Sequence, residues 1–465
     1  MREASLTRRE LVAGGAALAA SSWLLAGRAG AQASPSLRAL AREVKGPVLT
    51  PRDSAKLVFN ERYADIRPLA VVQPVNAADV QACVRWAAQR NVRITARSGG
   101  HSYAGYSTAR GGLVVDLRRL ASVSLSGRTV TAGPATHLID LYAKLARRNA
   151  TVPGGSCPTV GLAGLALGGG MGLAGRRFGL TSDNVTALQI VTADGRVRRC
   201  DADTNADLFW ACRGGGGGNF GIVTSLQLRA HRVSSAAWFQ ISWPLSQGEE
   251  ALAAWQQLAP AAPSALTSIF TIAQGRVSAA GQWFRGEASL RRLLGPLTRV
   301  AGASLSTGSA GYLAMMQRWA GCAGETVEAC GAFRPERFDA GSAYVSKPLS
   351  ARARAIAVAQ AQRGGGTLLL DAYGGAINKV KADATAFVHR DELFCIQFYS
   401  GSSNADWLRS AQRALRPYTS GAYQNYIDPQ LPNWEQAYYG ANLARLREIK
   451  RAVDPDRVFR FRQAL

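Results

Sequence analysis

Two glycine-rich loops constrain this chain more than any other feature. The first reads RSGGHSY from Arg97 to Tyr103 and places His101 directly after two glycines. The second reads PGGSCPTVG from Pro153, contains Cys157, and runs into a tract that carries Gly161, Gly164, Gly168, Gly169, Gly170 and Gly172. Glycine has no side chain, so it lets backbone amides approach an anionic ligand and adopts positive φ without steric cost. The two loops predict a binding site for a phosphate-bearing cofactor.

Each loop also has a plainer interpretation. The glycine tract is compatible with a helix-packing surface of small residues, and His101 taken alone with an ordinary turn histidine. The tract lacks the strand, the G-x-G-x-x-G turn and the acidic residue of a Rossmann site, so it does not predict a nicotinamide cofactor.

Composition and charge limit the number of domains and the classes of partner that we expect. A chain of 465 residues with 47% apolar content can bury one or two large cores, so we expect two or three domains. The formal charge of +24 by itself suggests an anionic partner. The basic residues are dispersed, mostly as single arginines, and no long Lys/Arg tract with interleaved aromatics is present. We therefore expect no nucleic-acid partner.

The N-terminus has the features of an export signal. Paired arginines, Arg8 and Arg9, precede an apolar run from Leu11 to Leu25, and small residues follow at Ala31 and Ala33. This pattern predicts a twin-arginine signal peptide over residues 1–33 and a periplasmic or secreted protein. The alternative is a membrane anchor, but the run is shorter than the roughly twenty residues of a membrane span. We expect no stable membrane span after cleavage.

Seven cysteines in an exported chain suggest disulfides. Cys322 and Cys330 flank a short Gly/Glu-rich loop and form the first candidate pair, and Cys200 with Cys212 forms a second. An odd total leaves at least one thiol without a cysteine partner. Two cysteines are expected in the core, namely Cys83 and Cys395. Neither the cysteine spacing nor the four scattered histidines predict a metal site.

Alternating strands and helices in the first half of the chain predict an α+β fold. The expected strands cover residues 69–74, 92–96, 112–117, 129–133, 187–192, 222–228, 367–375 and 393–399. The expected helices cover residues 77–90, 138–148, 207–213 and 433–453. The turn at 193–196 predicts a β-hairpin. We expect a lead-in segment at 34–62, a cofactor domain at 63–232, a substrate domain at 233–418 and a C-terminal segment at 419–465.

The two loops, read as RSGGHSYAGYS and PGGSCPTVGLAGLALGGGMG, resemble the attachment loops of the berberine bridge enzyme-like oxidases of the vanillyl-alcohol-oxidase superfamily. The resemblance continues through the glycines before Asn219 to the C-terminus. In that family the histidine carries the 8α-methyl group of FAD and the cysteine carries carbon 6 of the ring. The resemblance therefore implies a PCMH-type FAD-binding domain, with FAD attached covalently through His101 and Cys157. It also implies a substrate domain in which helices cover an antiparallel sheet.

The resemblance also implies which residues surround the flavin. We expect contacts from Arg97, Ser98, Gly99, Gly100, Ser102, Gly154, Gly155, Val160, Gly161, Gly164, Gly168, Gly169, Asn219, Gly221, Ile222 and Val223. The family residue three positions after the attachment cysteine lies near the oxygen-reacting face of the flavin. A valine there accompanies oxidases, so Val160 favours molecular oxygen as electron acceptor.

Three polar residues are the predicted catalytic group. The run NYID from Asn425 resembles the family's N-Y-x-D element, whose tyrosine takes the substrate hydroxyl proton, and this implies Tyr426 as base. A free tyrosine titrates at about pH 10, so this role needs a phenolate stabilised by a cation, the flavin dipole or a hydrogen-bonding partner. Asp371 resembles the assisting carboxylate of carbohydrate oxidases, and Gln397 occupies a substrate-facing strand position. Each is also compatible with a buried polar residue satisfied within the core.

These features together predict an oxidase with bicovalent flavin that acts on a sugar, an oligosaccharide or a similar alcohol and releases hydrogen peroxide. One alternative is a tailoring oxidase or dehydrogenase for a secondary metabolite or an aromatic alcohol. Another is a basic, non-catalytic binding protein on the same scaffold. Tyr103, Tyr106, Tyr438, Tyr439 and Asn442 are further candidates for the cleft, which the sequence does not rank.

Overall fold

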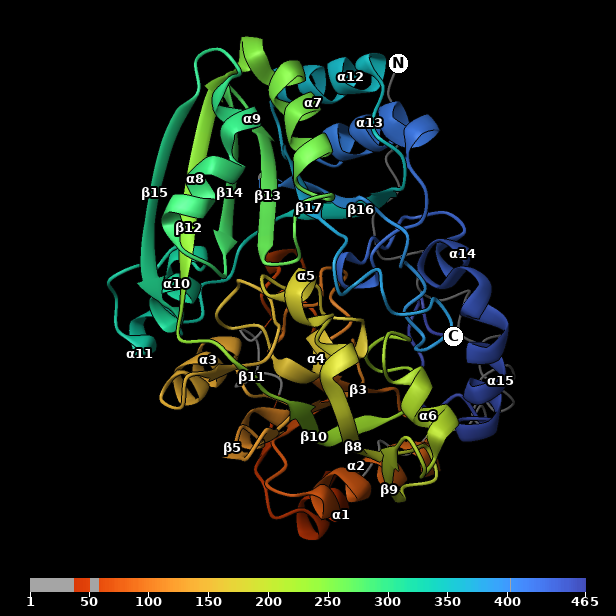
Figure 1. Cartoon of the computed structure of the whole chain (residues 1–465). Coiled ribbons are helices and arrows are strands. Elements are labelled where there is room, and N and C mark those ends of the chain that lie inside the picture. Colours follow the sequence, from red (N-terminus) through yellow and green to blue (C-terminus); the bar gives the residue numbers. More distant parts are fainter. Residues whose placement is uncertain (1–36, 51–57, 402) are drawn as a thin grey trace, which may run out of the picture. The chain divides into compact units, whose positions relative to one another are not determined.

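The computed structural model describes residues 37–50, 58–401 and 403–465 (Figure 1). The chain falls into two units, Met1–Ala39 and Leu40–Leu465, and all features below except the start of helix α1 belong to the second. The predicted signal peptide at residues 1–33 lies outside the described residues. None of the helices in the described part is long and apolar enough to cross a membrane. The first described helix is α1 (Leu37–Glu43).

The N-terminal half contains a small, largely parallel sheet. Its strands are β1 (Val48–Leu49), β2 (Ala70–Val72), β4 (Leu113–Asp116) and β3 (Ile94–Arg97), in that spatial order. Because β2 and β3 both run parallel to β4, β2 must connect to β3 by a crossover, which α2 (Ala77–Gln89) provides. Asn76 caps this helix by accepting a hydrogen bond from the Asp79 amide at 2.9 Å. The glycine loop with His101 follows β3 directly.

The N-terminal half also contains a five-stranded antiparallel sheet. Its spatial order is β5 (Val123–Ser126), β6 (Thr129–Ala132), β10 (Ile222–Arg229), β8 (Val185–Val191) and β9 (Val197–Asp201). The predicted hairpin is confirmed, because β8 pairs antiparallel with β9 across the turn at 193–196. A two-stranded ladder joins β7 (Ala150–Thr151) to β11 (His231–Arg232). The associated helices are α3 (Leu138–Ala146), α4 (Leu162–Leu167), α5 (Gly175–Phe178) and α6 (Ala206–Ala211).

The second half is built on a seven-stranded sheet whose neighbouring strands are all antiparallel. The spatial order is β15 (Ser304–Gly311), β12 (Ser235–Pro244), β14 (Arg276–Trp283), β13 (Leu266–Ala273), β17 (Thr367–Ala372), β18 (Phe394–Ser400) and β16 (Asp339–Val345). Its helices are α7 (Gly248–Leu258), α8 (Glu287–Leu293), α9 (Gly295–Thr298), α12 (Ala351–Gln362) and α13 (Ala405–Leu415), of which α7, α12 and α13 lie together in Figure 1.

Side-chain alternation divides the seven-stranded sheet into two faces. Leu368, Leu370 and Ile396 belong to the apolar core that includes residues of these helices. The intervening residues on the same strands, such as Asp371 and Gln397, point to the opposite face, because side chains alternate along a strand. The predicted α+β class, with an antiparallel sheet covered by helices, is confirmed.

The C-terminal tail differs from the single helix expected over 433–453. It forms α14 (Trp434–Tyr439), a short turn and α15 (Leu443–Val453). Gly440 causes the break, because its φ of 47° is incompatible with a continuous right-handed helix. Beyond α15, the Asp454 carboxylate accepts hydrogen bonds from Lys450 Nζ at 2.6 Å and from the Val458 amide at 2.7 Å. These contacts fix the path of the last residues.

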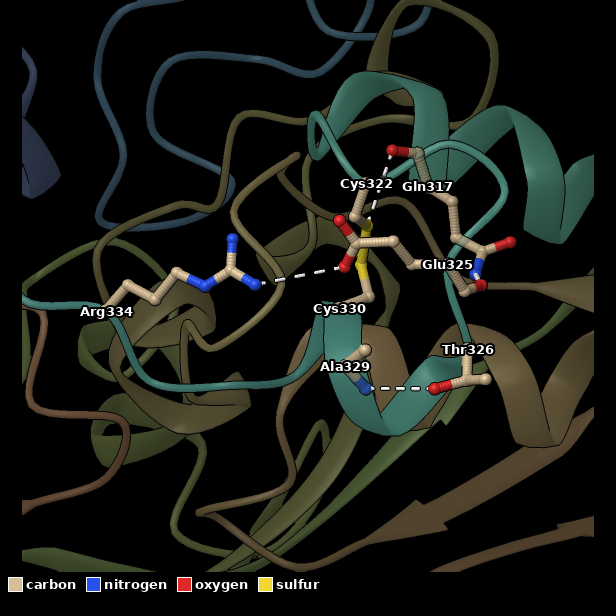
Figure 2. Close-up of a disulfide and its surroundings, with 7 residues drawn as sticks. All are labelled: Gln317, Cys322, Glu325, Thr326, Ala329, Cys330 and Arg334. Carbon is tan, nitrogen blue, oxygen red and sulfur yellow. Dashed lines mark hydrogen bonds and ion pairs between the residues drawn. A yellow bond between two sulfur atoms is a disulfide. The ribbon is translucent and has the colours of Figure 1, made fainter.

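A disulfide joins Cys322 to Cys330, as predicted, between α10 (Tyr312–Trp319) and α11 (Val327–Cys330). Figure 2 shows the enclosed loop, which is held by a hydrogen bond from Gln317 Nε2 to the Glu325 carbonyl at 2.8 Å. Arg334 forms an ion pair with Glu325 at 3.9 Å. The disulfide therefore anchors the start of the segment 331–338.

The second predicted disulfide is wrong, since Cys200 and Cys212 are both free thiols buried in the core of the first half. Each packs there as a small apolar residue. Cys83 and Cys395 are buried free thiols, as expected.

Candidate active site

One cavity brings the two glycine loops together with the open face of the seven-stranded sheet. Its volume is about 720 Å³. The lining includes most of the residues expected around a flavin, namely Ser98, Gly99, Gly100, His101, Ser102, Gly155, Cys157, Val160, Gly161, Gly164, Gly221, Ile222 and Val223. It also includes the three predicted catalytic residues, Asp371, Gln397 and Tyr426. Residues more than 250 positions apart in the sequence thus share one site.

Five expected flavin contacts do not line this cavity, namely Arg97, Gly154, Gly168, Gly169 and Asn219. Arg97 is buried, and its Nη2 lies 3.0 Å from the Asp116 carboxylate, which ties the end of β3 to β4. Asn219 is buried and accepts a hydrogen bond from the Leu465 amide at 3.1 Å. These two side chains support the loops beside the cavity.

The two glycine loops touch through their backbones. A side chain on Gly99 would collide with backbone atoms of Thr159 and Gly161, and one on Gly161 would collide with Ser98. Ser98 Oγ in turn donates to the Pro134 carbonyl at 2.7 Å. Only glycine at positions 99 and 161 allows this approach, which holds His101 and Cys157 at the same cavity wall.

The ring of His101 packs against two aromatic rings. Its ring stacks on Phe59 with centroids 4.0 Å apart and meets Phe333 edge-on at 6.1 Å. Its Nε2 lies 2.9 Å from Thr159 Oγ1. Burial, with a smaller contribution from His137, lowers the pKa of His101 to about 3. The imidazole is therefore neutral at physiological pH, and one of its two ring nitrogens carries a lone pair.

Cys157 is a free thiol whose side chain is accessible within the cavity. Desolvation by the surrounding protein raises its pKa, and a hydrogen bond with Ser156 partly offsets that rise. The residue is therefore a protonated thiol at neutral pH in the protein without cofactor, and it is not engaged in a disulfide.

The open face of the sheet contributes a second group of polar residues. Asp371 on β17 and Gln397 on β18 are both buried side chains. Tyr426 ends a 3-10 turn at Gln424–Tyr426, and its hydroxyl donates to Asp371 Oδ2 at 3.4 Å. Tyr103, from the first glycine loop, stacks on Tyr426 with centroids 5.6 Å apart and accepts a hydrogen bond from Gln397 Nε2 at 2.9 Å. This aromatic pair connects the loop of His101 to the sheet.

The pKa values of Tyr426 and Asp371 are not those expected for a tyrosine held as a phenolate. Burial and the nearby Asp371 raise the pKa of Tyr426. Burial also raises the pKa of Asp371 to about 7, although the hydrogen bond from Tyr426 opposes this. Among the described residues that line the cavity there is no lysine or arginine. The Asp371 carboxylate accepts a hydrogen bond from the Tyr426 hydroxyl, so it favours the neutral phenol rather than the stabilised phenolate that we expected.

Sequence reasoning left several cavity residues unranked or unnoticed. Of the five further candidates, Tyr103 and Tyr106 line the cavity, whereas Tyr438, Tyr439 and Asn442 do not. Thr159 is buried and does not line the cavity, but its Oγ1 lies 2.9 Å from His101 Nε2; its place two residues after Cys157 was the available local signal. Other cavity residues that were not singled out are Phe59, Glu336, Phe338 and Tyr399. These come from distant segments and carry no local motif.

The lining fits FAD in its chemistry. Part of it is built of glycines from both loops and of Gly217, Gly218 and Gly221, where backbone amides can approach a pyrophosphate without interference from side chains. Another part is formed by side chains of the sheet, including Thr267, Ile269 and Leu369. Glycines suited to a phosphate, together with side chains of mixed polarity, are what a dinucleotide site beside a small-molecule site requires.

Comparisons with known proteins agree with this arrangement. Residues 68–201 match a family model described as an FAD binding domain, and residues 422–465 match one described as berberine and berberine like. The wild-type structure of Physcomitrella patens BBE-like 1 is 31% identical and superposes with a TM-score of 0.87, covering 92% of this chain and 98% of that one. The chain belongs to the berberine bridge enzyme-like family.

Two curated relatives extend this family assignment. The uncharacterized FAD-linked oxidoreductase YgaK of Bacillus subtilis is 32% identical over 424 residues, which cover 87% of this chain and 92% of YgaK. A chitooligosaccharide oxidase of Gibberella zeae is 31% identical over 434 residues, which cover 86% of this chain and 87% of that protein. The predicted resemblance is confirmed, and this berberine bridge enzyme-like protein is an FAD-linked oxidoreductase.

Proposed function

We propose that the protein is an exported sugar oxidase, with FAD attached through His101 and Cys157 and molecular oxygen as electron acceptor. Its substrate is a sugar or oligosaccharide, oxidised at an alcohol or hemiacetal carbon, and hydrogen peroxide is the second product. The observation that carries the proposal is the Tyr426–Asp371 pair, which faces the same cavity as His101 and Cys157. The relative that oxidises chitooligosaccharides supports a sugar substrate. Export rests on the arginine-containing N-terminal sequence.

Attachment needs a nucleophilic nitrogen and a thiol at one wall of the cavity. His101 supplies the nitrogen, because its neutral ring keeps a lone pair and its Nε2 is engaged with Thr159, which leaves Nδ1 for the bond. Cys157 would supply the thiol from the neighbouring loop. Each bond would replace one C–H bond of the cofactor and remove one hydrogen from the residue, and the two electrons and two protons released would pass to molecular oxygen, the proposed acceptor. Two covalent bonds would retain the cofactor outside the cell, so the cavity need not close around it.

The chemistry that bound FAD supplies is acceptance of a hydride from the substrate carbon, followed by reoxidation by oxygen. Tyr426 takes the proton from the substrate hydroxyl and passes its own phenolic proton to Asp371. This relay removes the need for a stable phenolate, because the carboxylate accepts the proton that the tyrosine releases. Gln397 holds Tyr103 against Tyr426 and so positions the base. Val160 lines the cavity with a small side chain, which supports access of oxygen.

The relay predicts a specific pH dependence. Burial raises the pKa of Asp371 to about 7, so below that pH the carboxyl is protonated and cannot accept the proton from Tyr426. We expect kcat/KM to fall as the pH decreases through about 7. Asp371→Asn should lower kcat/KM at pH 8 by about 10²-fold and abolish this acidic limb. Measurement of peroxide release between pH 5 and 9 checks the prediction. A variant with the wild-type profile would remove Asp371 from the proton path.

Thr159 offers a second test, on attachment alone. Thr159→Val keeps the size of the side chain but removes the partner of His101 Nε2. We expect the fraction of flavin bound through His101 to fall by about tenfold, from the loss of roughly 1.4 kcal/mol of orientation. The bond through Cys157 should remain. Peptide mass mapping of denatured protein measures each bond, and Thr159→Ser, which restores the hydroxyl, is the control. If the fraction of flavin bound through His101 is the same in Thr159→Val as in the wild type, Thr159 does not orient the ring.

A further inference from the structure

The cavity is acidic although the protein is strongly basic. The chain has a formal charge of +24, yet among the described lining residues the charged side chains are those of Glu336 and Asp371, with no lysine or arginine. Asp371 contacts Tyr426 and is accounted for by the proton relay. Glu336 has no role in that relay. An anionic substrate group entering this cavity would lose water and find no described cation to replace it.

Glu336 is fixed at the cavity wall through both its backbone and its side chain. Its amide donates to the Phe59 carbonyl at 2.9 Å, and its carbonyl accepts from the Glu61 amide at 2.8 Å. Its Oε2 accepts a hydrogen bond from the Tyr399 hydroxyl at 2.6 Å. Tyr399 is itself held by stacking on Phe338, with centroids 5.1 Å apart. The carboxylate is therefore preorganised on an exposed part of the wall, where a ligand can reach it.

Strand register separates Tyr399, the partner of Glu336, from Asp371. Asp371 pairs with Cys395 across β17 and β18, whereas Tyr399 pairs with Thr367. Four residues along a strand correspond to about 13 Å between backbone positions. Tyr399 and Asp371 lie on the same face of the sheet, since both line the cavity. A substrate oxidised beside Tyr426 would therefore meet Tyr399 and its partner Glu336 through a sugar unit other than the oxidised one.

We propose that Glu336, held by Tyr399, determines specificity by binding this remote sugar unit. Its carboxylate accepts hydrogen bonds from hydroxyl or ammonium groups and repels carboxylate, sulfate or phosphate groups. This inference rests on the proposed sugar oxidase activity and narrows its preferred substrates to neutral or amino-sugar oligosaccharides over uronic acid oligosaccharides. The neighbouring Arg334 does not neutralise the site, since its guanidinium is paired with Glu325 (Figure 2).

The test uses three oligosaccharides that share their reducing-end units and differ only in the remote unit, which is glucose, glucosamine or glucuronic acid. For the holoenzyme at pH 7 and low salt, we expect KM for the glucuronic acid compound to exceed that for the neutral compound by about tenfold. The glucosamine compound should have a KM equal to or below that of the neutral compound. High salt should narrow these differences, because it screens partly exposed charges.

Glu336→Gln removes the charge and keeps an acceptor for Tyr399. We expect KM for the glucuronic acid compound to fall and KM for the glucosamine compound to rise, so that the two differ by less than about threefold. Glu328→Gln is the matched control, since Glu328 is an exposed glutamate of the disulfide loop outside the cavity. It should retain the wild-type discrimination. Visible absorbance of the flavin verifies that each variant is folded and loaded.

The outcomes separate this inference from the proposed function. Turnover of all three compounds with equal KM, or unchanged discrimination in Glu336→Gln, would overturn the role of Glu336 and leave the oxidase activity standing. A loaded enzyme whose flavin is bleached by none of the three would overturn the proposed function and the inference together.

Discussion

Replacement of Tyr426 by phenylalanine is expected to slow anaerobic flavin reduction by about 10²- to 10⁴-fold, the usual contribution of a positioned general base. The ring of phenylalanine can still stack on Tyr103, so the packing that orients the loop is kept. What is lost is the hydroxyl that links the substrate to Asp371. The colour and the amount of bound flavin should not change. Stopped-flow bleaching with a saturating oligosaccharide measures the effect.

The control for this variant is Tyr418→Phe. Tyr418 packs at the edge of the seven-stranded sheet's core and does not line the cavity. It should reduce its flavin at the wild-type rate. Equal bleaching rates in Tyr426→Phe and in the wild type would remove Tyr426 from the mechanism. This conclusion would not depend on whether the flavin is bound through His101 and Cys157.

The second large effect concerns retention of the cofactor. The single variants His101→Ala and Cys157→Ala should each keep the flavin through the other bond, and the colour should stay with the protein after acid precipitation. In the double variant no covalent bond remains, so we expect more than about nine-tenths of the flavin to be released into the supernatant. The cavity is open and its described lining supplies no cation for the pyrophosphate, which explains why non-covalent binding alone should be weak.

Cys200→Ala controls for general disturbance of the fold, because Cys200 is a buried free thiol outside the cavity. It should retain the flavin fully. If the double variant also held its flavin through denaturation, another residue would have to carry the bond.

Local structure followed closely from local sequence. The helix predicted at 77–90 is α2 (Ala77–Gln89), and the strand predicted at 129–133 is β6 (Thr129–Ala132). Apolar periodicity and capping residues determine such elements without reference to the rest of the chain. The prediction of one helix over residues 433–453 was wrong at Gly440, where a glycine with positive φ divides the apolar stripe between two helices.

The assembly of the site was only partly predictable. The glycine loops and the NYID run identified His101, Cys157 and Tyr426, because each lies in a compact motif. The proposed roles of Thr159 and Glu336 rest on their contacts with His101 and Tyr399, which lie far away in the sequence. The register of β17 on β18, which sets Asp371 apart from Tyr399, likewise depends on strand pairing that no local pattern encodes.

The electrostatic environment of Tyr426 was also not predictable from the sequence. A tyrosine was expected to need a stabilised phenolate, whereas burial raises the pKa of Tyr426 and brings that of Asp371 to about 7. Both shifts arise mainly from desolvation by burial, and the burial of a side chain depends on the complete fold.

Mass measurement of the purified, denatured protein tests the central claim most directly. The account predicts one FAD added to each polypeptide, with peptide mapping that finds the flavin bound to both His101 and Cys157. A colourless protein with the unmodified mass of its polypeptide would contradict it.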